Sequence, residues 1–196
     1  MFDLVPLVES AGYLGIALII FAESGILIGF FLPGDSLLFT AGFLASQGLL
    51  SIVPLIILLF IAAVAGDAVG YFFGHKVGPK IFSRPKSFWF NPAHIEKTRT
   101  FFERYGATTI LLARFLPAVR TFAPIMAGVG GMSYRVFATY NAVGALAWAC
   151  GITLLGYFFG QIIPNPDKYL IPVVLVIIVL SVLPTVWQII KEKRKV

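Results

Sequence analysis

Three uninterrupted apolar stretches constrain this chain most, because each is long enough to cross a lipid bilayer as a helix. They cover residues 51–74, 134–160 and 169–190, and a transmembrane helix needs about 20 such residues. Hydrophobic residues make up 59% of the 196-residue chain and charged residues only 12%, whereas a soluble domain reaches roughly 45–50% even with glycine counted. The sequence therefore predicts a single all-α integral membrane domain, residues 1–196. It excludes a cytosolic enzyme, a secreted disulfide scaffold and a disordered chain.

Two further apolar regions are interrupted near their middles. The first, residues 13–50, is broken by Leu-Pro-Gly-Asp at 32–35, and the second, residues 107–132, is broken by Pro117 and Pro124. Proline cannot donate the helical hydrogen bond and glycine adds backbone freedom, so each region should bend or break there. The ten residues before Pro117 would span about 15 Å as a helix, which is half a bilayer. Each broken region is therefore predicted to form a re-entrant loop.

Short words of sequence recur in the same order in the two halves of the chain. Phe-Leu-Pro stands at 31–33 and 115–117, Ala-Gly at 41–42 and 127–128, and Gly-Tyr-Phe-Phe-Gly at 70–74 and 156–160. Such words can recur by chance in apolar sequence, but three in order favour an internal repeat. Repeat one (13–74) and repeat two (107–160) would each comprise a re-entrant loop and a span. The two would enter the membrane from opposite faces, which is the inverted-repeat plan of secondary transporters.

The basic residues lie late in the chain and predict its orientation. Residues 1–75 hold five acids and no base, whereas the remainder holds all 15 bases and four acids. The basic loop 75–106 and the basic tail 191–196 should both be cytoplasmic. They lie on one side if 107–132 is re-entrant, because only two crossings then separate them, the second being the final helix at 169–190. The N-terminus would lie outside.

The basic loop also carries apolar residues at helical spacing. Asn91 and Pro92 form a helix start, and the segment from there to Tyr105 sets aromatic and aliphatic side chains against its bases. An interfacial amphipathic helix is therefore expected here. Its bases are assigned to anionic lipid headgroups rather than to nucleic acid.

Four charged residues fall inside the two broken regions: Glu23, Asp35, Arg114 and Arg120. Each would cost roughly 2.5–3.5 kcal/mol at a bilayer centre if it were unpaired. The two acids of the first loop and the two arginines of the second can neutralise each other where the loops meet. One interpretation is a set of buried salt bridges that holds the loops together. The other is a polar site at the midplane, where guanidinium groups bind a phosphate and a desolvated carboxylate takes up a proton.

Other polar residues of the spans carry weaker signals. Asp67 lies near the inner end of the first span, where it is either a satisfied polar residue beside the headgroups or a proton relay. Asn141 is expected to make an interhelical hydrogen bond. Glycines at every fourth position from Gly66 to Gly78 predict a face that packs closely on another helix. No metal site is expected, because the two histidines lie in the polar loop without ligand partners.

Taken together, these motifs resemble those of the DedA family, whose shared module is called the VTT domain. The resemblance rests on Glu23, on Asp35 within Phe-Leu-Pro-Gly-Asp-Ser at 31–36, and on Arg-Phe-Leu-Pro-Ala-Val-Arg-Thr at 114–121 with Ala-Gly at 127–128. It implies a bacterial inner-membrane protein with paired re-entrant loops. The family is associated with envelope homeostasis that depends on the proton motive force, and with returning undecaprenyl phosphate or phospholipids across the membrane. Its functional acids match Glu23 and Asp35, and its functional arginines match Arg114 and Arg120.

We therefore expect a lipid transporter, not an enzyme, that needs no cofactor and has a membrane lipid and protons as its partners. Arg114 and Arg120 would bind the anionic headgroup, Glu23 and Asp35 would exchange protons, and Asp67 and Asn141 would be accessory residues. Three alternatives stay open. The first is a proton-coupled antiporter for ions or drug cations in envelope homeostasis. The second is a lipid phosphatase, for which the membrane regions lack a nucleophile or metal-ligand pattern, and the third is an assembly factor without transport.

Overall fold

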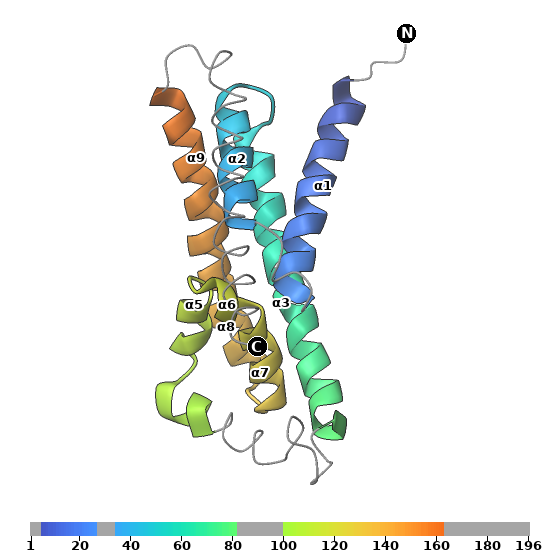
Figure 1. The fold of residues 1–196 in the computed structure, drawn as a ribbon, viewed down its shortest axis with the longest axis vertical. Coiled ribbons are helices and arrows are strands. Elements are labelled where there is room, and N and C mark those ends of the chain that lie inside the picture. The colour runs from blue at the N-terminus through green and yellow to red at the C-terminus, as the bar shows by residue number, and fades with distance from the viewer. Residues whose placement is uncertain (1–4, 27–33, 82–99, 163–196) are drawn as a thin grey trace, which may run out of the picture.

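The computed structural model describes residues 5–26, 34–81 and 100–162, and every regular element within them is a helix. The helices are α1 (Val5–Gly25), α2 (Gly34–Ser46), α3 (Ile52–Ile81), α5 (Thr108–Ala113), α6 (Pro117–Arg120), α7 (Phe122–Val129), α8 (Tyr134–Ala145), the π-helical turn η2 (Leu146–Cys150) and α9 (Gly151–Ile162). The all-α prediction is thereby confirmed for the described part of the chain (Figure 1). The final helix expected at 169–190 and most of the amphipathic helix lie outside the described residues, although residues 100–105 are helical.

Within the residues that the structure describes, two helices are long and apolar enough to cross a membrane, and both were predicted. One covers Ile52–Gly78 with a mean hydropathy of 2.6, and the other covers Tyr134–Ile162 with a mean hydropathy of 1.7. The second is formed by α8, η2 and α9 in succession, so its middle is a single π-helical turn. The first continues beyond the apolar run into a more polar last turn, which makes α3 longer than the predicted span.

The two broken regions form shorter helices. α1 ends at Gly25, before the predicted break, and α2 begins at Gly34. In the second region α5 ends at Ala113, and Pro117 occupies the first position of α6, where its missing N–H costs no hydrogen bond. Pro124 likewise lies in the first turn of α7. The prolines therefore start helices here, and the bend falls in the residues between α5 and α6.

Figure 1 shows how these elements are arranged. The helix α3 and the continuous helix from α8 to α9 run the height of the molecule. The pair α1 and α2 occupies one half of that height, and α5, α6 and α7 occupy the other. α1 and α2 approach from one end and α5 to α7 from the opposite end, so the inner ends of these helices meet at the middle of the molecule.

The closest helix contacts are made by small residues and recur between the two halves. α2 packs on α9 and α7 packs on α3. A Cβ at Gly42 would lie 3.0 Å from the Tyr157 nitrogen, and a Cβ at Gly128 would lie 2.7 Å from the His75 nitrogen, in contact with the Tyr71 carbonyl oxygen. Gly42 and Gly128 are 86 residues apart, as are Tyr71 and Tyr157. The return helix of each half therefore packs on the long helix of the other half through equivalent positions.

The predicted glycine face of α3 is confirmed by its contacts. Gly66 lies against the backbone of α1 at Phe21 and Gly25, and Gly74 and Gly78 lie against α7. A side chain at any of these three positions would collide with a neighbouring helix. One face of α3 therefore packs on both α1 and α7, which fixes these two helices relative to each other.

Large apolar side chains cover the outside of the molecule. Leu18 of α1, Val53 of α3 and Leu155 of α9 are each about two-thirds exposed, at 66%, 65% and 64%. Soluble proteins rarely expose large contiguous apolar surfaces, whereas a surface facing lipid tails has no reason to be polar. The burial pattern is that of a membrane protein, in which Glu23, Asp67 and Arg114 are buried inside.

Candidate functional site

Five charged side chains gather where the inner ends of these helices meet, and they come from five different parts of the chain. Glu23 lies in the last turn of α1, Asp35 in the first turn of α2, Asp67 in the middle of α3, Arg114 directly after α5, and Arg120 at the end of α6. All four predicted loop charges are brought together, and Asp67 joins them. They form two separate groups rather than one.

Arg120 is the centre of the first group. One of its terminal nitrogens pairs with Glu23 Oε1, and the other, Nη1, donates to Asp35 Oδ1 at 2.7 Å. The Glu23 side chain is 1% exposed and that of Arg120 is 11% exposed, but that of Asp35 is 47% exposed. The arginine of one half therefore joins both acids of the other half, with one acid fully buried and the other open to the surroundings.

Arg114 is the centre of the second group, and its partners differ from those expected. It pairs with Asp67 and donates to Asn141 Oδ1 at 2.6 Å. It does not form an ion pair with either acid of the first loop among the described residues. Asp67 was expected near the end of its span, but α3 continues to Ile81, so Asp67 lies at the level of Arg114. Asn141 makes the expected interhelical contact and also donates to the Val64 carbonyl at 3.4 Å.

Trp148 links the two groups and was missed by the sequence analysis. Its Nε1 donates to Asp35 Oδ1 at 2.7 Å, and its ring lies 4.8 Å from the Arg120 guanidinium and 5.6 Å from that of Arg114. Both distances are within the range of cation–π attraction. The available signal was its position, because tryptophan favours the membrane interfaces and this one lies mid-span, where its N–H needs a partner. It lies in η2, and π-helical turns are frequent at functional sites.

Glu23 keeps one oxygen unpaired. Within the described residues, Glu23 Oε2 is buried and has no hydrogen-bond partner. Gly34 packs so closely on this carboxylate that a Cβ at position 34 would overlap it. The position of Glu23 therefore depends on the absence of a side chain at the start of α2.

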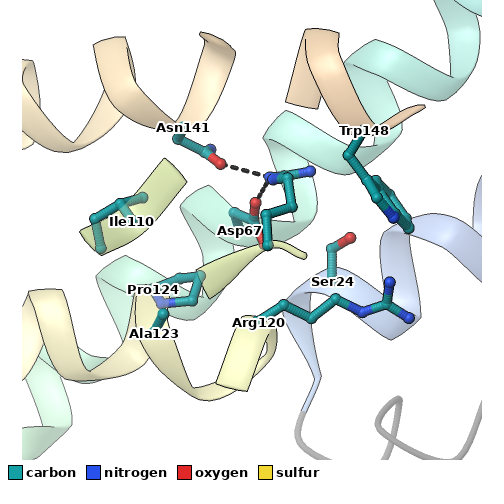
Figure 2. Close-up of a pocket in the computed structure, with 9 residues that line it drawn as sticks. Ser24, Asp67, Ile110, Arg120, Ala123, Pro124, Asn141 and Trp148 are labelled. Atoms are coloured by element: carbon teal, nitrogen blue, oxygen red, sulfur yellow. Dashed lines mark hydrogen bonds and ion pairs between the residues drawn. The ribbon is translucent and has the colours of Figure 1, made fainter. Parts of the chain in front are cut away.

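The space between the two groups is small. Figure 2 shows Asp67 and Asn141 on one side of this space and Trp148 and Arg120 on the other. The cavity measures about 10 Å³, which is at the limit of what holds one water molecule. A phosphate group does not fit between the two arginines in this state.

Comparison with known proteins now assigns the family. The model of the VTT domain matches residues 32–158, a segment that holds every residue of the two groups except Glu23. The chain is 50% identical over 179 residues to Protein DedA of Escherichia coli strain K12, covering 90% of this chain and 81% of that protein. This chain belongs to the DedA family. The resemblance stated from its motifs is thereby confirmed.

Other relatives of this DedA family member are named as membrane proteins. An uncharacterized membrane protein of Mycobacterium leprae is 42% identical, with 85% of this chain and 74% of that protein covered. The inner membrane protein YqjA of Escherichia coli strain K12 is 35% identical, with 76% of this chain and 68% of that protein covered. No solved structure matches the chain significantly. The relatives' names and the two long apolar helices together identify a membrane protein.

Proposed function

We propose that this DedA family member is a transporter that moves an anionic lipid, such as undecaprenyl phosphate or a phospholipid, across the bacterial inner membrane. The observation that carries the proposal is Arg120, a buried guanidinium at the meeting point of the two halves. Guanidinium forks match phosphate oxygens, and one partner of Arg120 is an exposed carboxylate that can be exchanged for another anion. Arg114 lies across Trp148 from Arg120 and supplies the second guanidinium.

The arrangement of the helices supports a membrane placement with two re-entrant loops. α1 with α2, and α5 with α6 and α7, would enter from opposite faces and meet at the midplane. The reciprocal glycine contacts support an inverted repeat, the plan on which secondary transporters place their sites. In this placement the basic loop 75–106 and the C-terminus are cytoplasmic, as the distribution of bases favours.

The charge balance of the site supports a coupling to protons. Three carboxylates and two guanidiniums leave one negative charge in excess when all are ionised. Glu23 Oε2 is buried and has no partner in the described part of the chain, so it is the position where a proton would neutralise that excess. Protonation of Glu23 would weaken its hold on Arg120 and make the guanidinium available to the headgroup. Loss of the proton would restore the pair and release the lipid.

Reconstitution of the purified protein into liposomes with labelled polyprenyl phosphate tests this function. The parent protein should move the lipid faster than protein-free liposomes do. Arg120→Lys, which keeps the charge but loses the fork, and Glu23→Gln should each lower the rate about ten-fold or more, since a hydrogen bond to a charged group contributes about 1.5–3 kcal/mol. Arg135→Lys, at an exposed position of α8, is the matched control and should leave the rate unchanged. If Arg120→Lys and Glu23→Gln moved lipid as fast as the parent, the assignment of the site would be wrong.

One observation favours a second candidate, a proton-coupled antiporter for ions or drug cations. The excess carboxylate charge of the site could attract a cation instead of an anion. Vesicles that hold a pH gradient separate the two functions. An antiporter would dissipate the gradient when a cation is added in the absence of transported lipid, and a lipid transporter would not.

A further inference from the structure

Two hydrogen-bond donors from different helices, α6 and η2, converge on a single oxygen. Arg120 Nη1 and Trp148 Nε1 each lie 2.7 Å from Asp35 Oδ1. Trp148 is buried, at 2% exposed, and the Arg120 side chain is only 11% exposed. Charge-assisted bonds of this length are among the stronger ones in proteins. The two donors therefore form a site for an oxyanion, and a carboxylate of the chain itself fills it.

We propose that Asp35 holds the place of the substrate's oxyanion in this state, and that Arg120 Nη1 and Trp148 Nε1 bind that oxyanion once Asp35 has left. The inference rests on the proposed function and adds Trp148 to its binding residues. The ligand chemistry is an oxyanion with free lone pairs, such as the phosphate of a lipid headgroup or free phosphate. A tryptophan N–H is a donor only, so this pair of donors does not suit a cation.

The exposure of the two acids indicates which of them leaves. Asp35 is 47% exposed and can turn outward, whereas Glu23 is 1% exposed and is held against Gly34. The cavity of about 10 Å³ between the arginines is too small for a phosphate beside the present groups. The incoming anion therefore has to replace a group already bound to Arg120, and Asp35 is the exposed one.

Trp148 also fixes the orientation of its partner. Its ring lies 4.8 Å from the Arg120 guanidinium, while its N–H reaches the same acceptor as that guanidinium. The indole thus holds the guanidinium and supplies a second donor beside it. A phenylalanine at position 148 would retain the ring contact and lose only the donor.

Two variants test the inference, and they should act in opposite directions. Trp148→Phe should weaken binding of a polyprenyl phosphate in detergent micelles about 10- to 100-fold, because a donor to a charged acceptor is lost. Asp35→Asn should tighten binding about ten-fold, because a neutral amide competes less well for the two donors. A residue with a purely structural role would not tighten binding when it is replaced. Equilibrium binding of radiolabelled lipid to the full chain gives both values, and thermal unfolding reports whether each variant is folded.

The chain offers an internal reporter for the same site. It has three tryptophans, so a Trp89→Phe/Trp187→Phe background leaves Trp148 as the only source of indole emission. Adding polyprenyl phosphate should change this emission in a saturable way, and adding Arg120→Lys to the background should shift the change to higher lipid concentrations. Inorganic phosphate is the second probe. If inorganic phosphate binds more weakly than the lipid, the ligand is a lipid headgroup. If it binds as tightly as the lipid, the ligand is free phosphate at the same site.

Unchanged affinity in a folded Trp148→Phe protein, or weaker binding in Asp35→Asn, would overturn the inference. If Trp148→Phe does not fold, Asp35→Asn decides alone. Should the parent transport lipid while these variants behave as the parent does, only this inference fails. Should the parent neither bind nor transport lipid, the proposed function fails with it.

Discussion

At the scale of single residues, Glu23 combines burial, charge and close packing. One carboxylate oxygen pairs with Arg120, and the other is buried without a partner among the described residues, against a glycine that leaves no room for a side chain. Isolated buried charges are costly, and under the proposed function this second oxygen is where a proton would be taken up. The unpaired oxygen is thus the feature that distinguishes this pair from a purely structural salt bridge.

Gly34→Ala tests whether Glu23 must keep its present position. The new Cβ would overlap the Glu23 carboxylate, which is the flexible end of its side chain, so the carboxylate should move away from Arg120 while the fold is kept. Lipid transport in liposomes should fall about ten-fold. Gly15→Ala in α1 is the matched control, because a Cβ there meets nothing within 4 Å and transport should be unchanged. Equal transport in the two variants would contradict this role of Gly34.

The pair of Asp67 and Arg114 should behave as a buried ion pair. Asp67→Asn leaves the Arg114 charge without an anionic partner, and the free energy of unfolding should fall by about 3–5 kcal/mol. Adding Arg114→Gln to Asp67→Asn should recover part of that loss, because no uncompensated charge remains. Thermal unfolding of the solubilised protein measures both effects, with Arg135→Gln as the exposed control. If the double variant loses as much free energy of unfolding as Asp67→Asn and Arg114→Gln lose separately, added together, the pair is not coupled.

At the scale of helices, small residues determine which elements touch. Gly42 and Gly128 occupy equivalent positions in α2 and α7 and approach the backbones of α9 and α3. Neither contact leaves space for a methyl group, whereas Gly151 meets nothing within 4 Å. The two halves are therefore held together by the same contact made twice.

Gly42→Ala and Gly128→Ala should accordingly destabilise the protein to a similar degree. Each forces a methyl group against a neighbouring backbone, and overpacking of this kind costs about 1–3 kcal/mol. Gly151→Ala should have no such cost. Melting temperatures in one detergent compare the three variants. A loss confined to one of the two contact glycines would argue against equivalent packing.

The sequence predicted the helices better than their faces. The long spans and the prolines of the second broken region act locally, through apolar length and a missing N–H, so they were predicted from the residues themselves. The charges of the loops were recognised because unpaired charges in a membrane are costly. The glycine face of α3 was predicted, but the partner of Arg114 and the contacts of Trp148 were not, because the apolar residues of a helix that is apolar all round carry no pattern that indicates its inward face. Asp67 was misplaced because α3 continues past the apolar run.

At the scale of the whole molecule, the proposed orientation makes a direct prediction about accessibility. The α2–α3 turn and the α7–α8 turn lie at opposite ends of the structure (Figure 1). The chain has a single cysteine, so a Cys150→Ser background permits one new cysteine at a time. Leu49→Cys, at an exposed position in the first turn, should react with an impermeant maleimide added to intact cells whose inner membrane is accessible. Ser133→Cys, in the second turn, should react only after the membrane is permeabilised. The reverse labelling pattern would show that the protein has the opposite orientation in the membrane.

The proposed function of this site is to move an anionic lipid in response to protons. Its most direct test is the rate at which purified protein moves labelled polyprenyl phosphate in liposomes with and without an imposed pH gradient. The parent should move the lipid faster than protein-free liposomes do, the gradient should change its rate, and Glu23→Gln should be slow and insensitive to the gradient. A parent protein that moves the lipid no faster than protein-free liposomes under either condition would contradict it.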